Sequence, residues 1–237
     1  MDPLDVRIDR KQTNVAVQDN ELIRAAYTME LREKRLLMLA ISKIRSSDMP
    51  SVGQSIGVEL TTEDFKAIFG YENPSRDMRA AAKGLMRRQV TISPNTKTEI
   101  VMQWVDAIEY REGRARILFG ATISKYLAGM VEQFTQIPLL EISKLNSKHS
   151  VRFYEMLKQM EKNKWLTIEL DELRSMLCLE NKYNTAGTLK KHIIEPSIAE
   201  LNKQSPWDIS VEYVKKGKAV KSVRITYKDK NQMPLEF

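Results

Sequence analysis

The order of predicted helices and strands repeats between the two halves of this 237-residue chain. The first half predicts a helix, a short strand, two more helices and a β-hairpin, at residues 29–44, 56–60, 61–70, 74–88 and 99–119. The second half predicts the same series at residues 147–160, 165–170, 171–177, 185–203 and 207–227. A duplicated structural unit is the simplest account of this order.

Local signals define these elements. Apolar residues recur at helical spacing in residues 36–44, and Val90 and Ile92 begin strand-like alternation. Single strands are expected at residues 99–110 and 114–119. Pro196 interrupts the helix at 185–203, because proline cannot donate a hydrogen bond to the carbonyl of His192. The sequence therefore predicts a kink or break after Glu195.

Two consecutive helices followed by a β-hairpin are typical of a winged helix, in which the second helix can enter a major groove and the hairpin forms the wing. We therefore predict an α+β fold of two tandem winged-helix domains related by pseudo-duplication. The expected divisions are a flexible N-terminal tail, a first domain, a second domain and a C-terminal tail, at residues 1–19, 20–137, 138–230 and 231–237.

Charge divides the chain unevenly. It has 38 Lys and Arg against 31 Asp and Glu, for a net charge of +7. Up to Ser143 there are 20 basic and 19 acidic residues, and after it 18 and 12. The basic second half favours a polyanionic partner such as nucleic acid, and an ordinary solvated surface is the alternative.

Composition excludes several other classes. No apolar run is long enough for a transmembrane helix, and no signal peptide is apparent, so we expect a cytoplasmic protein without a membrane partner. The single cysteine, Cys178, excludes a disulfide framework and a four-cysteine zinc site. There is no phosphate-binding loop, and His149 and His192 lack metal-ligand spacing. We expect a protein without enzymatic activity, metal or cofactor.

The second half carries the strongest candidate DNA-binding residues. Small polar side chains stand at the start of the helix near 185, where base edges are usually read, and two lysines follow. The hairpin after this helix is strongly basic. The candidates are Asn184, Thr185, Thr188, Lys190, Lys191, Lys215, Lys216, Lys218 and Lys221. The alternative is a capped helix and a solvated hairpin.

The corresponding helix of the first half begins at Pro74 and offers mainly basic side chains. Arg76, Arg79 and Lys83 share one helical face by their spacing. We expect them to contact phosphates rather than bases, and a solvated basic face is the alternative.

Several segments resemble the iteron-binding plasmid replication initiators of the Rep family. The similarity runs from about residue 20 to 227 and is clearest at residues 20–27, 34–35, 134–136, 152–157 and 194–202. The last segment is the most specific, because Pro196 belongs to the family pattern. The resemblance is carried by the order and spacing of these segments together.

The resemblance implies a monomer that binds direct repeats, called iterons, in double-stranded origin DNA. It also implies a dimer that binds an inverted repeat and represses its own gene, a role in plasmid copy control, and contacts with the host helicase-loading machinery. The second domain would read most bases, and the first would contact neighbouring DNA and provide the dimer interface. The family often has arginines where this chain has Thr185, Lys190, Lys191 and His192, which leaves the preferred bases open.

Two alternatives remain. The C-terminal residues Gln232, Leu235 and Phe237 resemble a peptide that binds the bacterial sliding clamp, and a frayed tail is the alternative. A winged-helix transcriptional repressor without a replication role would have the same fold and charge.

Overall fold

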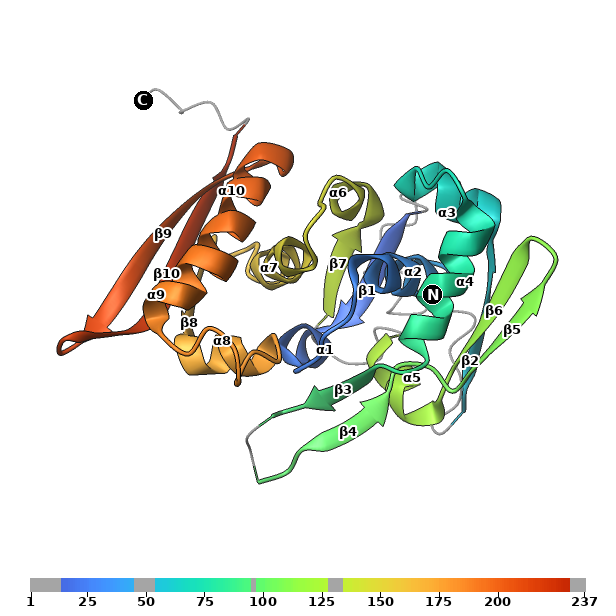
Figure 1. Ribbon diagram of the computed structural model, residues 1–237, viewed down its shortest axis with the longest axis horizontal. Coiled ribbons are helices and arrows are strands. Elements are labelled where there is room, and N and C mark those ends of the chain that lie inside the picture. The colour runs from blue at the N-terminus through green and yellow to red at the C-terminus, as the bar shows by residue number, and fades with distance from the viewer. Residues whose placement is uncertain (1–13, 45–53, 95–96, 128–133, 231–237) are drawn as a thin grey trace, which may run out of the picture. The chain divides into compact units, whose positions relative to one another are not determined.

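A computed structural model of the chain describes residues 14–44, 54–94, 97–127 and 134–230 (Figure 1). The chain forms two compact units, which divide after Ser143 rather than after Ile137 as expected. Helix α6 (Leu139–Ser143) belongs to the first unit because it packs on other helices of that unit. Its residues Leu139 and Ile142 are fully buried.

The first unit is built on a winged helix. Its sheet has the antiparallel strand order β2-β6-β5, and its helices are α2, α3 and α4. These elements are α2 (Leu31–Ser42), β2 (Ile56–Thr61), α3 (Thr62–Phe69), α4 (Pro74–Leu85), β5 (Ala107–Arg111) and β6 (Arg114–Phe119).

Local sequence signals set the ends of these helices. The Thr61 side chain accepts a hydrogen bond of 3.0 Å from the Asp64 backbone N–H, which caps α3. Gly70 then ends α3 in the left-handed conformation, with φ 69°. Helix α4 begins at Pro74, as predicted.

Helix α2 forms the centre of the first unit and is buried from Glu33 to Ile41. A helix that is buried on every side must satisfy its polar residues internally. The Glu33 carboxylate does so by accepting hydrogen bonds from Arg88 Nε at 2.7 Å and from the Glu30 backbone N–H at 2.8 Å. This partly buried pair holds the segment that follows α4 against α2.

Further elements surround this core. Strand β1 (Val15–Asp19) pairs antiparallel with β7 (Phe134–Pro138), and α1 and α5 complete the unit at Asn20–Arg24 and Ala121–Leu127. The prediction of a flexible tail up to residue 19 is therefore wrong for residues 15–19, where Ala16 is fully buried. The rest of the predicted tail, residues 1–13, lies outside the described residues.

The predicted single strand at residues 99–110 is also wrong. It divides into β4 (Ile100–Gln103), which pairs with β3 (Gln89–Ile92), and β5, which pairs with β6. The division falls where Trp104 and Val105 turn fully into the core. Trp104 packs edge-on against Tyr27, with ring centroids 5.0 Å apart. Burial of this large side chain outweighs strand continuity.

The second unit repeats the winged helix with the strand order β8-β10-β9, the same topology as β2-β6-β5. This confirms the predicted pseudo-duplication. Its elements are α7 (Lys148–Gln159), β8 (Trp165–Glu169), α8 (Leu170–Met176), α9 (Ala186–Leu189), η2 (Lys190–Ile194), α10 (Glu195–Gln204), β9 (Trp207–Lys216) and β10 (Ala219–Asp229).

Two local predictions in this unit need correction. The helix predicted to begin at Asp171 begins one residue earlier, at Leu170, so Asp171 lies in its first turn and pairs with Arg174 at 2.6 Å. The helix near Pro196 is not broken after Glu195. A π-helical turn over Lys190–Ile194 precedes the proline and connects α9 to α10.

Residues 194–202 also hold the second unit together. The Glu200 carboxylate accepts hydrogen bonds from the backbone N–H groups of Asn146 and Ser147 at 2.6 and 3.2 Å. The Asn202 side chain accepts from the Ile209 N–H at 2.7 Å and donates to its carbonyl at 3.0 Å. These contacts join α10 to the start of α7 and to β9.

In the described part of the chain, no helix has the length and hydrophobicity of a membrane span.

Candidate nucleic-acid interface

The start of α9 is exposed and polar, but its threonines are engaged with each other. Thr185 accepts a hydrogen bond of 3.1 Å from the Thr188 N–H, and the Thr188 hydroxyl lies 3.3 Å from the Thr185 N–H as its acceptor. This reciprocal capping box fixes the helix start. Both residues are exposed. Their hydroxyls cap the helix and also lie at the surface, where a ligand can reach them.

Arg174 holds the backbone at Asn184, the residue before the capping residue Thr185. The guanidinium of Arg174 donates to the backbone carbonyls of Tyr183 and Asn184, at 3.4 and 3.5 Å. The Asn184 side chain is exposed. The structure thus fixes the backbone of Asn184 and leaves its amide group at the surface, as a residue that reads a base edge requires.

The three basic residues of the π-turn have different environments. Lys190 Nζ lies 4.4 Å from the centre of the Tyr213 ring and 3.6 Å from Glu195 Oε1. His192 stacks on Tyr183, with centroids 5.6 Å apart. Lys191 is exposed and has no ion-pair partner among the described residues. Lys191 is therefore the cation of this turn most available to DNA.

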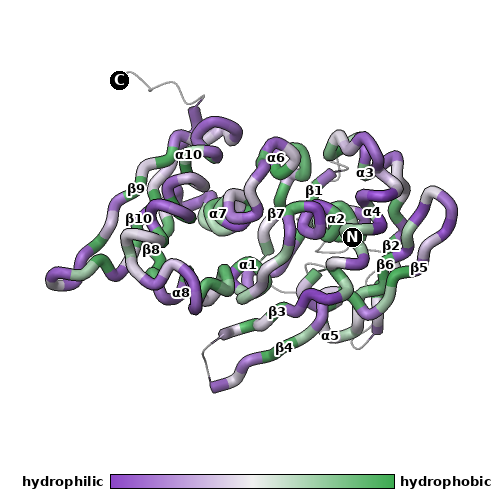
Figure 2. Tube along the Cα trace, in the orientation of Figure 1, coloured by the Kyte–Doolittle hydropathy of each residue, from purple (hydrophilic) through white to green (hydrophobic). Residues whose placement is uncertain are grey.

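The wing of the second unit ends in a cluster of lysines. The hairpin between β9 and β10 turns at Gly217, which has φ 66°. Its tip is hydrophilic in Figure 2. The predicted side chains are all exposed and form no ion pair with any described residue, namely Lys215, Lys216, Lys218 and Lys221. Farther from the tip, cations do have partners: Lys228 pairs with Asp208 at 3.3 Å, and Arg224 lies over Trp165.

Helix α4 of the first unit presents its predicted residues to solvent. Arg76, Arg79 and Lys83 are exposed, while Met78 and Leu85 are buried on the opposite side. Arg76 Nε lies 3.8 Å from the buried Asp77 carboxylate, and its side chain is still 77% exposed. Lys83 has no ion-pair partner in the described residues.

Each candidate recognition helix contacts its own wing through a cation and a tyrosine ring. In the first unit the Arg79 guanidinium lies 4.7 Å from the centre of the Tyr110 ring, and the Tyr110 hydroxyl donates to the Arg79 carbonyl at 3.3 Å. In the second unit Lys190 takes the same place over Tyr213. Because Tyr110 and Tyr213 each lead into a hairpin turn, the duplication extends to this contact.

Burial affects both tyrosines. It raises the pKa of Tyr213 to about 12, with a further contribution from Glu195. Burial likewise raises the pKa of Tyr110, and the nearby Arg79 opposes that shift. Both phenols therefore stay neutral near pH 7, and each ring meets its cation without a charge of its own.

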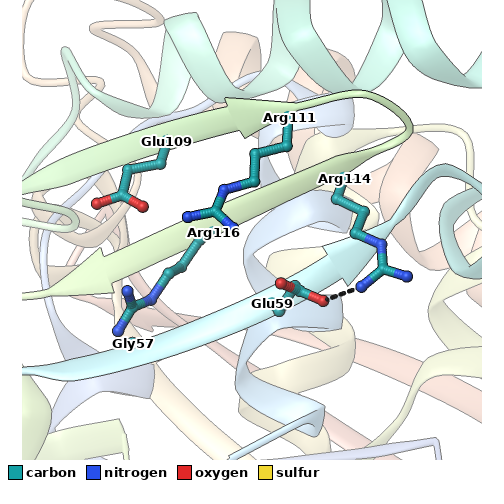
Figure 3. A pocket seen from close by; sticks show the side chains of 6 residues that line it. All are labelled: Gly57, Glu59, Glu109, Arg111, Arg114 and Arg116. Carbon is teal, nitrogen blue, oxygen red and sulfur yellow. Dashed lines mark hydrogen bonds and ion pairs between the residues drawn. The ribbon is translucent and has the colours of Figure 1, made fainter.

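A group of arginines on the wing of the first unit was not predicted from the sequence (Figure 3). Arg111 lies opposite Arg114 in the strand register, and both line a cavity of about 180 Å³ with Arg116. Arg114 Nη1 pairs with Glu59 at 2.8 Å. The Arg116 guanidinium lies over Gly57, where an added Cβ would come within 2.9 Å of its Nε.

Strand periodicity could have revealed this group. Residues 114 and 116 share one face of a strand, and a short hairpin places residue 111 beside them. Like charges directly opposite each other destabilise a sheet unless an anion lies between them. Glu59 and Glu109 line the same cavity and lie opposite Arg116 in the strand register, so these two carboxylates offset part of the positive charge. Arg111 and Arg116 have no ion-pair partner in the described residues and are the candidate phosphate contacts of the first wing.

Other predicted sites are not tested by this geometry. The clamp-binding residues Gln232, Leu235 and Phe237 lie outside the described residues. Within the residues that the structure describes, no group of three or more His, Cys, Asp or Glu side chains could hold a metal ion.

Comparison with known proteins adds to this geometry. A family model described as "Initiator Replication protein, WH1" matches residues 15–158, and another described as "Initiator Rep protein, WH2" matches residues 169–227. The fold resembles the crystal structure of the Pi initiator protein in complex with iteron DNA, with a TM-score of 0.75 and 20% identity. That match covers 93% of this chain and 99% of the other.

Two curated relatives from Escherichia coli are also similar. A protein named "Replication initiation protein" is 25% identical over 206 residues, which cover 84% of this chain but only 65% of the relative. An uncharacterized 27.6 kDa protein is 24% identical over 204 residues, which cover 80% of this chain and 85% of the relative. Because the WH1 and WH2 models match both winged-helix units in order, the chain belongs to the initiator replication protein family.

Proposed function

We propose that this protein is a sequence-specific DNA-binding initiator of plasmid replication that binds direct-repeat iterons. The observation that carries the proposal is the second unit, where an exposed polar helix start lies on a winged helix whose wing lysines form no ion pair with any described residue. Family membership supports a replication role, and a similar fold is known in the Pi initiator bound to iteron DNA.

The two kinds of contact have separate tasks. Lysines of the second wing and arginines of the first bind phosphates and release counterions, which gives affinity and strong salt dependence. Asn184 and Lys191 meet base edges in a major groove, which gives sequence preference. Opening of the origin then follows from several bound copies and recruited host proteins. The protein itself uses no catalytic residue and no cofactor.

The finer assignments rest on the family resemblance. The monomer binds iterons, whereas a dimer binds an inverted repeat and represses the gene for the protein. We place the protein in the cytoplasm, where its partners are the host helicase-loading machinery and, through Gln232, Leu235 and Phe237, the sliding clamp. Calorimetry with a peptide of residues 230–237 tests the clamp contact, and the absence of heat on mixing with the clamp would remove it.

The main experiment is footprinting of the purified protein on a replicon library at about 150 mM salt, which suppresses non-specific phosphate binding. Protection of several tandem repeats is the expected result. Protection of a single inverted repeat alone would instead support a transcriptional repressor without a replication role. No discrete protection would contradict both functions.

Oligomeric state has its own test. Light scattering over a range of protein concentrations, with and without repeat DNA, should show a dimer that gives way to monomers on direct repeats. A single species under all conditions would contradict the proposed monomer–dimer switch.

A further inference from the structure

The recognition helix of the second unit, defined here as residues 186–204, contains a π-helical turn at its centre. In this turn the Glu195 N–H bonds to the carbonyl of Lys190, five residues earlier. Pro196 follows directly. In an α-helix, residue 196 would donate to the carbonyl of His192, but proline has no N–H and its ring collides with that carbonyl. The wider turn accommodates the proline without breaking the helix.

The π-turn changes which residues share a face of the helix. An α-helix rotates by about 100° per residue, so Leu189 and Ile198 would lie about 180° apart on an uninterrupted helix. Both are nevertheless buried, with 0% and 6% exposure. A π-turn accommodates one additional residue, which brings the two side chains within about 80° of each other. The turn therefore lets both pack into the core.

The same rotation directs the polar start of the helix outwards. Without the π-turn, Thr188 would lie about 80° from Ile198, near the edge of the buried face. With the turn the separation is about 180°, and Thr188 is exposed. The turn itself carries Lys191, also exposed. π-turns inside α-helices frequently mark functional sites.

We propose that Pro196 is a positioning residue for DNA sequence selectivity, because it holds the π-turn that directs Thr188 and Lys191 away from the core and towards the bases. This inference rests on the proposed DNA-binding function. Pro196 does not contact DNA in this account. It determines the direction in which the reading residues meet the groove, while the lysine wing supplies affinity independently of sequence.

The test is Pro196→Ala in the full chain, with Pro206→Ala as the matched control. Pro206 is exposed and outside the helix, and its carbonyl, which accepts from the Lys230 N–H at 2.8 Å, is retained in the variant. Fluorescence anisotropy measures the affinity for the preferred repeat and for a scrambled duplex. Hydrogen exchange followed by NMR reports whether the new amide at position 196 becomes protected.

For Pro196→Ala we expect the ratio of the two affinities to fall by about tenfold, the effect of losing one good base contact. Affinity for the scrambled duplex should stay within about twofold, and the new amide should be protected by an α-helical bond. Pro206→Ala should leave both affinities unchanged. Pro196→Ser supplies the same N–H with another side chain and should reproduce the loss.

An unchanged ratio in a folded Pro196→Ala protein would overturn the inference, whether or not the new amide is protected. A parallel loss of binding to both duplexes would also overturn it, because the effect would then be general unfolding. If the parent protein itself does not prefer any repeat over the scrambled duplex, the proposed function fails first. The two failures are therefore distinguishable.

Discussion

The two winged-helix units share one topology but use their basic residues differently. In the first unit Arg88 is bound to Glu33, Arg79 lies on Tyr110, and Arg114 is paired with Glu59. At the tip of the second wing, four exposed lysines have no ion-pair partner in the described residues. Many cations of the first unit therefore stabilise the fold, whereas those of the second wing are available for a polyanion.

The recognition helices of the two units also differ in how they are held and in what they expose. Helix α4 is regular and begins at a proline, and the segment that follows it is held by the partly buried Glu33–Arg88 pair. The helix at residues 186–204 begins with a threonine capping box and contains a π-turn. The first helix is thus held by its packing against α2, and the second leaves its polar start exposed at the surface. This contrast is the reason we propose that the second unit, rather than the first, reads bases.

The largest expected effect comes from the second wing. Replacing Lys215, Lys216, Lys218 and Lys221 together by Ala should reduce the slope of log affinity against log salt concentration by about 3 to 4, because each phosphate contact contributes about 0.9. The measurement is DNA binding across a salt series.

A charge-matched pair of variants sharpens this result. Removing only Lys215 and Lys216 should change the slope by about 2, and removing Arg111 and Arg116 from the first wing by no more than that. If the arginine pair has the larger effect, the first wing is the main phosphate contact and the comparison is reversed.

The next effect concerns a glycine in each recognition helix. A Cβ at Gly84 would collide with the Glu33 carboxylate, which Arg88 and the Glu30 N–H hold in place. Gly84→Ala should therefore lower the free energy of unfolding by about 1–3 kcal/mol, measured by chemical denaturation.

The matched control is Gly187→Ala in the second unit. The nearest atom to a Cβ at Gly187 is Thr185 Oγ1 at 3.9 Å, an ordinary contact. This change should be neutral or raise stability by up to about 1 kcal/mol, because Ala favours a helix more than Gly does. Equal destabilisation by both substitutions would contradict the different packing of the two helices.

A third comparison concerns the exposed lysines of the two helices. Lys191→Ala should cost about 1–3 kcal/mol of binding energy and alter the preferred sequence. Lys83→Ala should weaken binding to all sequences alike and reduce the salt slope by about 1. Selection from a randomised duplex library distinguishes the two. An unchanged preference and affinity for Lys191→Ala would remove that residue from the reading surface.

The smallest effect is expected at the contact between helix and wing. Replacing Tyr213 or Tyr110 by Leu should weaken DNA binding by about 0.5–1 kcal/mol, the usual contribution of a cation–π contact at an exposed site. Phe variants keep the aromatic ring and remove only the hydroxyl, so they distinguish the contribution of the ring from that of the hydroxyl. The buried Tyr213 hydroxyl has no hydrogen-bond partner in the described residues, so Tyr213→Phe should be harmless. Tyr110→Phe loses the bond to the Arg79 carbonyl and should be slightly weaker.

Patterns that act over a few residues made much of this protein predictable. The cap at Thr61, the helix end at Gly70, the helix start at Pro74 and the turn at Gly217 all follow from local backbone chemistry. Repetition of such signals also predicted the two winged helices. The exposed lysines of the second wing were predicted because charged side chains on a hairpin must face either solvent or a ligand.

Contacts between distant residues were not predictable in this way. The pairing of β1 with β7, the division of the strand at Trp104 and the bond between Glu33 and Arg88 depend on residues far apart in sequence. The sequence also left open whether Thr185 and Thr188 cap the helix or face a ligand, since both roles use the same small polar side chains; the structure shows the reciprocal cap.

Local backbone preference and charge were enough to predict the order of the winged-helix elements, several of their capping residues and the basic character of the second half. Tertiary contacts determine which cations are neutralised and which have no ion-pair partner in the described residues, because an ion pair forms only where the fold brings two charged side chains together. The same holds for Pro196. The sequence shows that a regular α-helix is interrupted there, whereas packing of Leu189 and Ile198 decides that a π-turn replaces a break.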